Sequence, residues 1–120
     1  MIIIYYRSKC SSSVKAINWL EKRGIPYQKR KIEQISQERL YHILSLTDNG
    51  FFDIFKKKGN SVTQSKIEYI IDMNFDNAIK YICNHTEVLR TPVLFSSNKL
   101  LIGHDDIEIR KFIPKKSRNI

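Results

Sequence analysis

The sequence contains few cysteines and no long apolar segment, and these absences exclude several classes of protein. Only Cys10 and Cys83 occur among its 120 residues, so the dense disulfide framework of small secreted domains cannot form. No apolar run approaches the roughly 20 residues that a membrane-spanning helix needs. The first residues also lack the basic region and cleavage site of a signal peptide. We therefore expect a cytoplasmic protein with no membrane association.

Acidic residues are scarce as well. The chain has 12 Asp and Glu against 21 Lys and Arg, which gives a formal net charge of +9. This excess favours an acidic partner, namely a nucleic acid, an anionic protein surface or an oxyanion, but it does not choose among them. The three histidines are scattered and the cysteines do not form a ligand pair. We therefore expect no metal and no other cofactor.

The chain opens with a strand, a helix and a second strand. The short run of β-branched and aromatic residues at 1–6 predicts a buried strand. A helix is predicted from about Ser12 to Arg23, with Val14 and Leu20 facing inward, and Gly24 ends it. Ile25-Pro26-Tyr27 opens the next strand, which runs to about Ile32. Two strands joined by a helix over about thirty residues indicate a parallel pair.

Helical patterns fill residues 36–85. Ser36 is suited to cap the first of them, and Asn49-Gly50 ends it because this pair readily adopts a positive φ. Apolar spacing predicts further helices at about 51–57, 63–71 and 75–84, the last with Phe75 on its inward face. We expect no strand in this part of the chain.

The last part returns to strands. Residues 92–95 and 99–102 are apolar runs separated by Ser96-Ser97-Asn98, as in a hairpin. Asp105 or Asp106 is then suited to cap a final helix. The predicted fold class is α/β, with a thioredoxin-like four-stranded mixed sheet flanked by helices. We expect one domain over 1–114, with core halves at 1–35 and 86–114, a helical insertion at about 36–85, and a basic tail at 115–120.

Cys10 lies at the turn between the first strand and the first helix. Unpaired backbone N–H groups and the positive end of the helix dipole lower the pKa of a thiol at such a place. The serines beside Cys10 offer caps for the helix. Ser13 stands where a thioredoxin-like redox motif carries its second cysteine, and Thr91-Pro92 opens the third strand, where that fold places a cis-proline against the cysteine.

With these residues in place, the chain resembles the Spx-type transcriptional regulators of the arsenate reductase superfamily. The similarity runs nearly from end to end. Its motifs are Cys10 after Tyr5, Trp19-Leu20-Glu21, Gly24-Ile25-Pro26-Tyr27, Leu46-Thr47-Asp48-Asn49-Gly50, Leu89-Arg90-Thr91-Pro92-Val93, Leu101-Ile102-Gly103, and Arg110-Lys111-Phe112-Ile113-Pro114-Lys115.

This resemblance implies a regulator that binds the C-terminal domain of the RNA polymerase α subunit and modulates stress-responsive transcription. The family contacts that domain through a glycine that falls on Gly50 here, and a glycine lets a partner approach the backbone closely. The alternative is that Gly50 only closes its helix. We expect a monomer that contacts DNA only within the polymerase complex.

The chain departs from the family pattern at its cysteine motif. Many Spx proteins have Cys-x-x-Cys, which forms a disulfide, whereas Ser13 prevents that switch here. Cys10 could still be oxidised, or capped by a low-molecular-weight thiol. We expect Cys83 to be buried and structural, because it lies on an apolar helix face.

A second departure concerns the arginines that bind the oxyanion in arsenate reductases. Thr91 stands where those enzymes have an arginine before the cis-proline, and Arg90 precedes it. Lys56-Lys57-Lys58 replaces another arginine, although lysine lacks the bidentate fork. The sequence therefore argues against an enzyme. The alternative is a monothiol arsenate reductase or glutaredoxin-like reductase, in which Cys10 is the nucleophile and Arg7, Lys9 and Arg90 help bind the anion.

A third hypothesis is direct binding of nucleic acid. Basic residues near the C-terminus could face phosphates, although no helix-turn-helix, zinc finger or aromatic RNA-binding motif accompanies them. A solvated charged terminus is the alternative. The residues concerned are Lys111, Lys115, Lys116 and Arg118.

Overall fold

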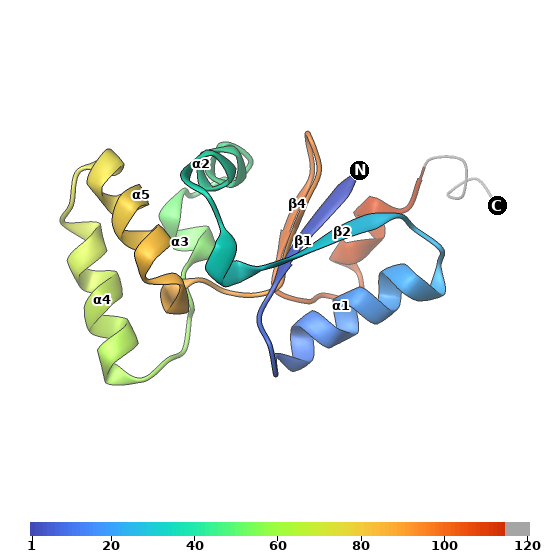
Figure 1. Cartoon of the computed structure of the whole chain (residues 1–120), viewed down its shortest axis with the longest axis horizontal. Coiled ribbons are helices and arrows are strands. Elements are labelled where there is room, and N and C mark those ends of the chain that lie inside the picture. The colour runs from blue at the N-terminus through green and yellow to red at the C-terminus, as the bar shows by residue number, and fades with distance from the viewer. Residues whose placement is uncertain (115–120) are drawn as a thin grey trace.

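The computed structural model describes residues 1–114, and the basic tail predicted at 115–120 lies outside the described residues. Four strands, five α-helices and three short 3₁₀ helices follow one another along the described chain (Figure 1). In order they are β1 (Ile2–Tyr6), α1 (Ser11–Lys22), β2 (Tyr27–Lys31), η1 (Ile32–Gln34), α2 (Gln37–Ser45), α3 (Phe51–Ile54), α4 (Ser61–Ile71), α5 (Phe75–Asn84), η2 (Thr86–Val88), β3 (Val93–Phe95), β4 (Leu100–Ile102) and η3 (Glu108–Phe112).

The strands form one mixed sheet in the order β2-β1-β3-β4. β1 pairs with β2 in parallel, as the strand–helix–strand pattern predicts, and with β3 in antiparallel orientation. β3 and β4 form the antiparallel hairpin expected around Ser97. The Thr91–Pro92 peptide bond is cis. This is the thioredoxin-like arrangement that the sequence predicts.

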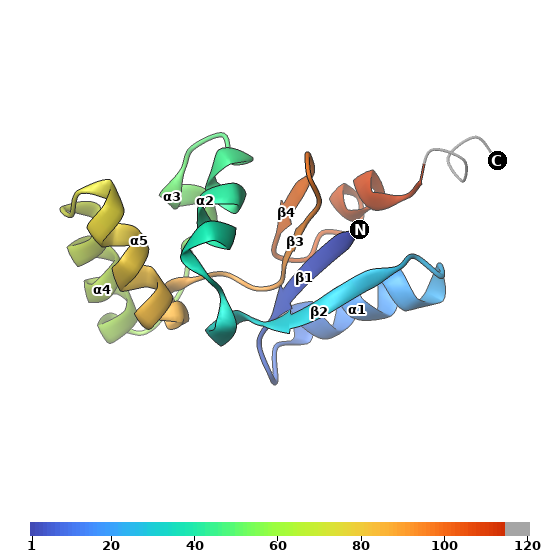
Figure 2. The ribbon, with the colours of Figure 1, turned by 45° about the horizontal axis from the view of Figure 1, so that its top comes forward.

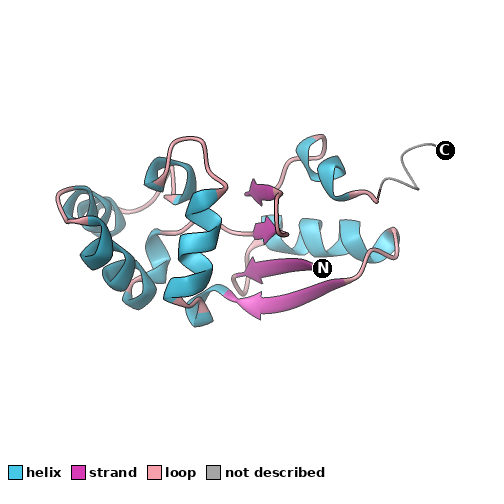
Figure 3. Ribbon diagram, turned by 90° about the horizontal axis from the view of Figure 1, so that it is seen from above, coloured by secondary structure: helices cyan, strands magenta, loops and turns pink. Residues whose placement is uncertain are grey.

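Each face of the sheet has its own apolar core. On one face, Ile4 packs with Ala16 and Leu20 of α1 and with Phe112 of η3. On the other face, a larger cluster joins β1 and β3 to α2, α4 and α5. In Figure 3 the sheet and α1 occupy one end of the molecule, and α4 and α5 occupy the other.

The segments that precede α4 and follow η2 meet beside the sheet. Phe55 and Leu89 form an isolated antiparallel bridge, and both side chains are buried. The N–H of Lys56 donates to the carbonyl of Val88 at 2.9 Å, and the N–H of Arg90 donates to that of Ile54 at 2.9 Å. α4, α5 and η2 therefore leave and rejoin the sheet half at neighbouring positions.

Several local expectations are wrong. Val14 and Phe75 were expected to face inward, but their side chains are 54% and 48% exposed. Cys10, and not a serine, occupies the position before the first residue of α1. The second strand starts at Tyr27. The last helix is a 3₁₀ helix, although Asp105 does accept hydrogen bonds at its start, from the N–H groups of Ile107 and Glu108.

The predicted cap at Ser36 is confirmed. Ser36 caps α2 by accepting a hydrogen bond from the N–H of Arg39 at 3.1 Å. Asn60 and Asn74 cap α4 and α5 in the same way. Within residues 1–114, none of the helices combines the length and the apolar character that crossing a membrane requires.

Candidate functional sites

The Cys10 thiol lies at the turn where β1 passes into α1. The turn closes when the N–H of Cys10 donates to the carbonyl of Arg7 at 3.3 Å, and it includes Lys9 at a φ of 62°. The cis Thr91–Pro92 bond lies opposite. There the hydroxyl of Thr91 donates to Sγ of Cys10 at 3.3 Å. The predicted contact between the cysteine and the strand that Thr91-Pro92 opens is therefore present.

The surroundings of the thiol favour its charged form. Partial burial raises the pKa of Cys10, but hydrogen bonds from the Ser13 and Thr91 hydroxyls outweigh it. The backbone N–H groups of Ser13 and Ser12 add to the same effect, so the pKa lies below its usual value. Burial alone acts on Cys83, whose pKa is raised. Cys10 is thus the more reactive thiol.

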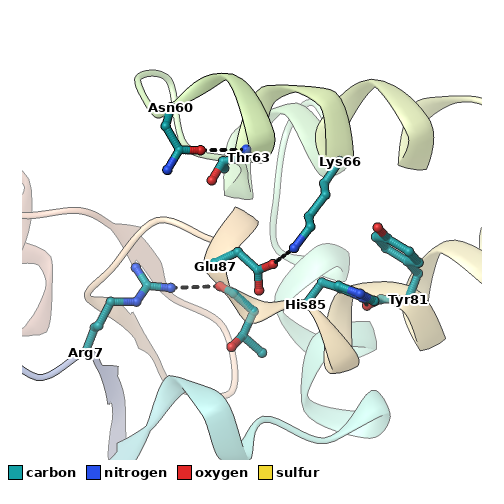
Figure 4. Close-up of polar contacts among 8 residues, drawn as sticks. Arg7, Asn60, Thr63, Lys66, Tyr81, His85 and Glu87 are labelled. Atoms are coloured by element: carbon teal, nitrogen blue, oxygen red, sulfur yellow. Dashed lines mark hydrogen bonds and ion pairs between the residues drawn. The ribbon is translucent and has the colours of Figure 1, made fainter.

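Arg7 clamps this turn to the opposite part of the chain (Figure 4). Its Nη2 donates to the carbonyl of Thr86 at 2.7 Å, and its Nη1 donates to the carbonyl of Leu89 at 3.1 Å. A longer contact of 3.4 Å reaches the hydroxyl of Thr91. The guanidinium therefore donates to neutral backbone carbonyls of η2 and of Leu89, which follows η2, and much of its donor capacity is used within the protein.

η2 is held from the other side as well. Glu87 pairs with Lys66 of α4, as Figure 4 shows. Tyr81 of α5 stacks on His85, with ring centroids 3.9 Å apart, and Nδ1 of His85 lies 2.9 Å from the carbonyl of Tyr81. The Cys10 turn is thereby connected, through Arg7 and η2, to the two helices at the far end of the molecule.

A basic hollow of about 500 Å³ opens over the thiol. Lys56 lines it, and burial together with the nearby Arg7 charge lowers the pKa of Lys56. Arg90 lines it too and lies directly against Gly103, where an added Cβ would be 2.7 Å from Nη2. Cys10, Arg7, Arg90 and Thr91, which the sequence assigns to one site, are therefore brought together here, and the hollow also contains Lys57, Lys58 and His104.

Gly50 lies apart from this hollow, at the turn between α2 and α3. Its φ of 63° and ψ of −132° belong to a region that residues with a side chain rarely adopt. The carboxylate of Asp53 accepts hydrogen bonds from the N–H groups of Asp48 and Asn49, both at 3.0 Å. The hydroxyl of Thr47 accepts one from the N–H of Gly50 at 3.1 Å. The turn is thus built by its own side chains.

Open space and exposed aromatic rings surround the Gly50 turn. No atom lies within 4 Å of the place where a Cβ of Gly50 would be. A hollow of about 540 Å³ beside it is lined by rings of α2, α3 and α5. Phe52 is 62% exposed, and the rings of Phe51 and Phe75 contact each other with centroids 5.5 Å apart. We call Tyr41, Leu44, Phe51, Phe52 and Phe75, which line this hollow with Gly50, the aromatic patch.

Sequence reasoning did not anticipate the aromatic patch or the role of Arg7 as a clamp. Periodicity assigned Phe75 to the core, so its exposure was missed. The acceptors of Arg7 lie 79 and 82 residues further along the chain, where no local pattern points to them. A pair of adjacent phenylalanines, Phe51-Phe52, was the available signal, because a short helix can bury only one of two neighbouring side chains.

The fold and the thiol at its strand–helix turn define a thioredoxin-like protein with a single cysteine in the Cys-x-x-Ser position. The model of the ArsC family matches residues 5–112. The chain belongs to the ArsC family.

The proteins similar in sequence and those similar in structure have different descriptions. The sequence relatives named here are Spx regulators, whereas the structural neighbours include a protein described as a possible arsenate reductase. The global transcriptional regulator Spx of Lactiplantibacillus plantarum is 30% identical, over 100% of this chain and 92% of its own length. Spx of Bacillus subtilis is 31% identical, over 99% and 92%. The chain is thus similar over its full length to Spx regulators, as its motifs indicated.

Solved structures support the fold. A structure of an ArsC family related protein from Bacteroides fragilis has a TM-score of 0.78 at 20% identity, and covers 93% of this chain and 97% of its own. A structure described as a possible arsenate reductase, from Streptococcus mutans, has a TM-score of 0.73 at 16% identity, with 100% and 98% covered.

Proposed function

We propose that the protein is a Spx-like transcriptional regulator that binds the C-terminal domain of the RNA polymerase α subunit through the Gly50 turn and the aromatic patch. The observation that carries this proposal is the geometry at Gly50. Its backbone is open to a partner and is bordered by exposed rings, which are common at the buried centres of protein interfaces. The full-length similarity to Spx regulators supports the same conclusion.

The arrangement suits a protein partner for a physical reason. A backbone without a Cβ lets the partner approach closely, while Phe52 and Phe75 supply apolar area that water leaves on binding. The turn does not need the partner in order to form, because Asp53 already satisfies its N–H groups. A preformed surface of this kind loses little conformational entropy on association.

A pull-down with the purified C-terminal domain of the α subunit, the α domain, tests the proposal. The wild type should be captured and Gly50→Arg should not, because the new side chain would occupy the contact. Gly24→Arg is the matched control: Gly24 also has a positive φ, of 62°, and no atom within 4 Å of its Cβ position. Both variants place an arginine, with the same added charge, at a glycine of positive φ, so equal loss of capture by both, or no capture of the wild type, would refute the proposal.

The second candidate is a monothiol reductase, either of arsenate or of mixed disulfides. The lowered pKa of Cys10 and the basic hollow above it favour this alternative. With arsenate, the thiolate would form an S–As(V) bond as one arsenate oxygen leaves as water. An external thiol would then attack the Cys10 sulfur, so that the electron pair of the broken S–As bond reduces the arsenic to As(III), and a second external thiol would free Cys10 by disulfide exchange. With a mixed disulfide, the thiolate would displace one thiolate, and an external thiol would free Cys10 in the same way. Arg7 counts against it, since its Nη1 and Nη2 are directed to the backbone carbonyls of Leu89 and Thr86.

An assay of arsenate reduction with glutathione and glutaredoxin separates the two candidates. We expect no turnover above the Cys10→Ser background. Turnover that Cys10→Ser abolishes would establish the reductase, whatever the result with the α domain.

A further inference from the structure

The two edges of the sheet differ in how they are protected against pairing with another chain. β2 and β4 are the edge strands. β2 carries the three consecutive basic residues 29–31, and charged side chains at an edge discourage pairing. β4 consists of the apolar residues Leu100–Ile102 and carries no charged side chain. An added strand would therefore meet less resistance beside β4 than beside β2.

Alternate backbone groups of β4 point away from β3. The N–H of Gly103 donates to the carbonyl of Pro92 at 2.8 Å, so these two residues form a hydrogen-bonded pair. Such pairs alternate along an antiparallel ladder, so in this register the backbone groups of Leu101 also face β3. The N–H and C=O groups of Leu100 and Ile102 therefore lie on the open edge.

Three of these four backbone groups have no hydrogen-bond partner among residues 1–114. The C=O of Leu100 accepts a hydrogen bond from Nζ of Lys111 at 2.9 Å. Within the described chain no such bond reaches the N–H of Leu100, or the N–H and C=O of Ile102. Two donors and one acceptor are thus open at neighbouring positions, which is the pattern that strand addition completes.

A hollow of about 420 Å³ follows this edge, and we call it the β4 hollow. Its walls come from both sides of the sheet: Leu46 and Thr47 between α2 and α3 on one side, and Glu108 and Lys111 of η3 on the other. In Figure 2 the β3–β4 hairpin lies between α2 and α3 on its left and η3, drawn in red, on its right. The walls leave space for one extended chain, whereas a second copy of the molecule would bring its own walls to the same edge.

Basic side chains lie at both ends of β4. Lys99 precedes the strand, and Arg90 lies against Gly103, which follows it. Lys57 lines the β4 hollow as well. Within residues 1–114, none of Lys57, Arg90 and Lys99 has a carboxylate within salt-bridge distance. Their positive charges are therefore available to a ligand in the β4 hollow.

The acidic side chains of the β4 hollow are mostly engaged within the protein. The carboxylate of Asp53 accepts hydrogen bonds from the N–H groups of Asp48 and Asn49. Glu108 pairs with Lys111 at 3.3 Å. The remaining carboxylate of the lining is that of Asp48. A ligand with acidic side chains therefore complements the β4 hollow better than a ligand with basic ones.

We propose that the β4 hollow binds an extended, acidic segment of a partner protein, which adds to the sheet as an antiparallel fifth strand. In antiparallel pairing one residue of the segment exchanges two hydrogen bonds with Ile102, and the carbonyl two residues later accepts from the N–H of Leu100. All three open groups are then paired, and the bond from Lys111 stays in place. A phosphate or another oxyanion cannot do the same, because the C=O of Ile102 needs a donor.

The register determines which side chains the segment should carry. Leu100 and Ile102 pack against the cluster on the α2 side of the sheet, so the two segment residues opposite them point to that side, beside Leu46. β-branched residues suit these two positions. Acidic residues suit the flanks, which reach Arg90 at one end and Lys99 at the other.

NMR titration of the isotope-labelled full chain with the peptide acetyl-Glu-Glu-Val-Thr-Val-Glu-Glu-amide tests the proposal. The amide signals of Leu100 and Ile102 should shift. With the peptide at about ten times its Kd, the exchange of these two amide hydrogens should slow about tenfold. The exchange of Leu101 should not change, because its N–H is already directed to β3.

Two control peptides separate the backbone from the charge. A peptide with the Val-Thr-Val residues N-methylated keeps the charges but lacks the donors, so it should bind at least about tenfold more weakly. A peptide with lysine in place of every glutamate should cause no shift at the same concentration.

Two double variants test the basic ends of the β4 hollow. Arg90→Gln/Lys99→Gln should weaken binding of the acidic peptide roughly fivefold. The matched control is Lys31→Gln/Lys80→Gln, which removes the same charge from exposed positions on β2 and α5. It should leave the affinity unchanged.

Four results would overturn the proposal. They are no shift of Leu100 and Ile102 up to the solubility limit of the peptide, equal binding of the N-methylated peptide, equal weakening by the control pair, and shifts at the same two amides when the protein alone is concentrated, which would assign the edge to a second copy. Gly50→Arg should leave the titration unchanged, so this proposal and the function proposed above can fail separately.

Discussion

Replacing Arg7 with methionine tests whether the clamp between the Cys10 turn and η2 stabilises the fold. Methionine keeps a long unbranched side chain, but it removes the bonds to the carbonyls of Thr86 and Leu89, at 2.7 and 3.1 Å. A hydrogen bond from a charged donor contributes about 1.5–3 kcal/mol, and the lower end applies because these groups are only partly buried. We therefore expect a loss of roughly 3 kcal/mol.

Thermal unfolding followed by circular dichroism measures this loss. For a chain of this length, an entropy of unfolding near 2.1 cal/mol/K per residue converts that loss to a fall in Tm of about 12 °C. Arg30→Met is the control, since Arg30 also makes two hydrogen bonds, but only to its neighbours Gln28 and Lys29. Its Tm should change by no more than about 2 °C. An equally small change for Arg7→Met would show that the clamp contributes nothing net to stability.

Two further predictions concern hydrogen bonds at the two turns. Thr91→Val removes the hydroxyl that donates to Cys10, so the pKa of Cys10 should rise, and alkylation of this thiol by iodoacetamide should shift to higher pH. Cys83 provides the reference within the same chain, and a profile for Cys10 that does not move would contradict the assignment. Asp53→Asn should lower stability at pH 7 by roughly 0.5–1 kcal/mol and weaken capture of the α domain, whereas Asp105→Asn, a change at a similar turn on η3, should leave capture intact. Hydrogen bonds from Asn49 lower the pKa of Asp53 in the folded protein. The stability that the Asp53 carboxylate contributes is therefore complete above about pH 4, the pKa of an unfolded aspartate, and is lost as the pH falls through the lower pKa of the folded state. If Asp53→Asn lowered the stability as much at pH 2 as at pH 7, this pH dependence would be contradicted.

The sequence predicted the sheet and the position of Cys10 well, because both depend on local patterns. The strands are short apolar runs between turn residues, and the bounds of α5 agree with its periodicity. Pro92 follows a threonine at the start of β3, where the resemblance placed a cis bond, and the bond is cis.

The errors arise where tertiary contacts decide. Val14 was placed on the inward side with Leu20, but it is two residues from the fully buried Ala16, which puts its side chain on nearly the opposite side of α1. Phe75 begins α5 at the outer end of the helical segment, and its ring faces Tyr41 instead of the core. The clamp made by Arg7 joins residues about 80 positions apart. Helical periodicity carries no information about which neighbour is present on a given side.

The bridge between Phe55 and Leu89 has a consequence for how the molecule opens. Together with the hydrogen bonds of Lys56 and Arg90, it closes residues 57–87 into a loop whose two ends are already joined. α4 and α5 can therefore separate from the rest and return without displacing either end of their own segment. Since the ends stay together, reclosing requires no long-range search by the chain, and its entropic cost is small. If this opening occurs, the amide hydrogens of Lys56 and Arg90 should exchange slowly while those of α4 exchange faster, because the bridge stays closed when the two helices separate.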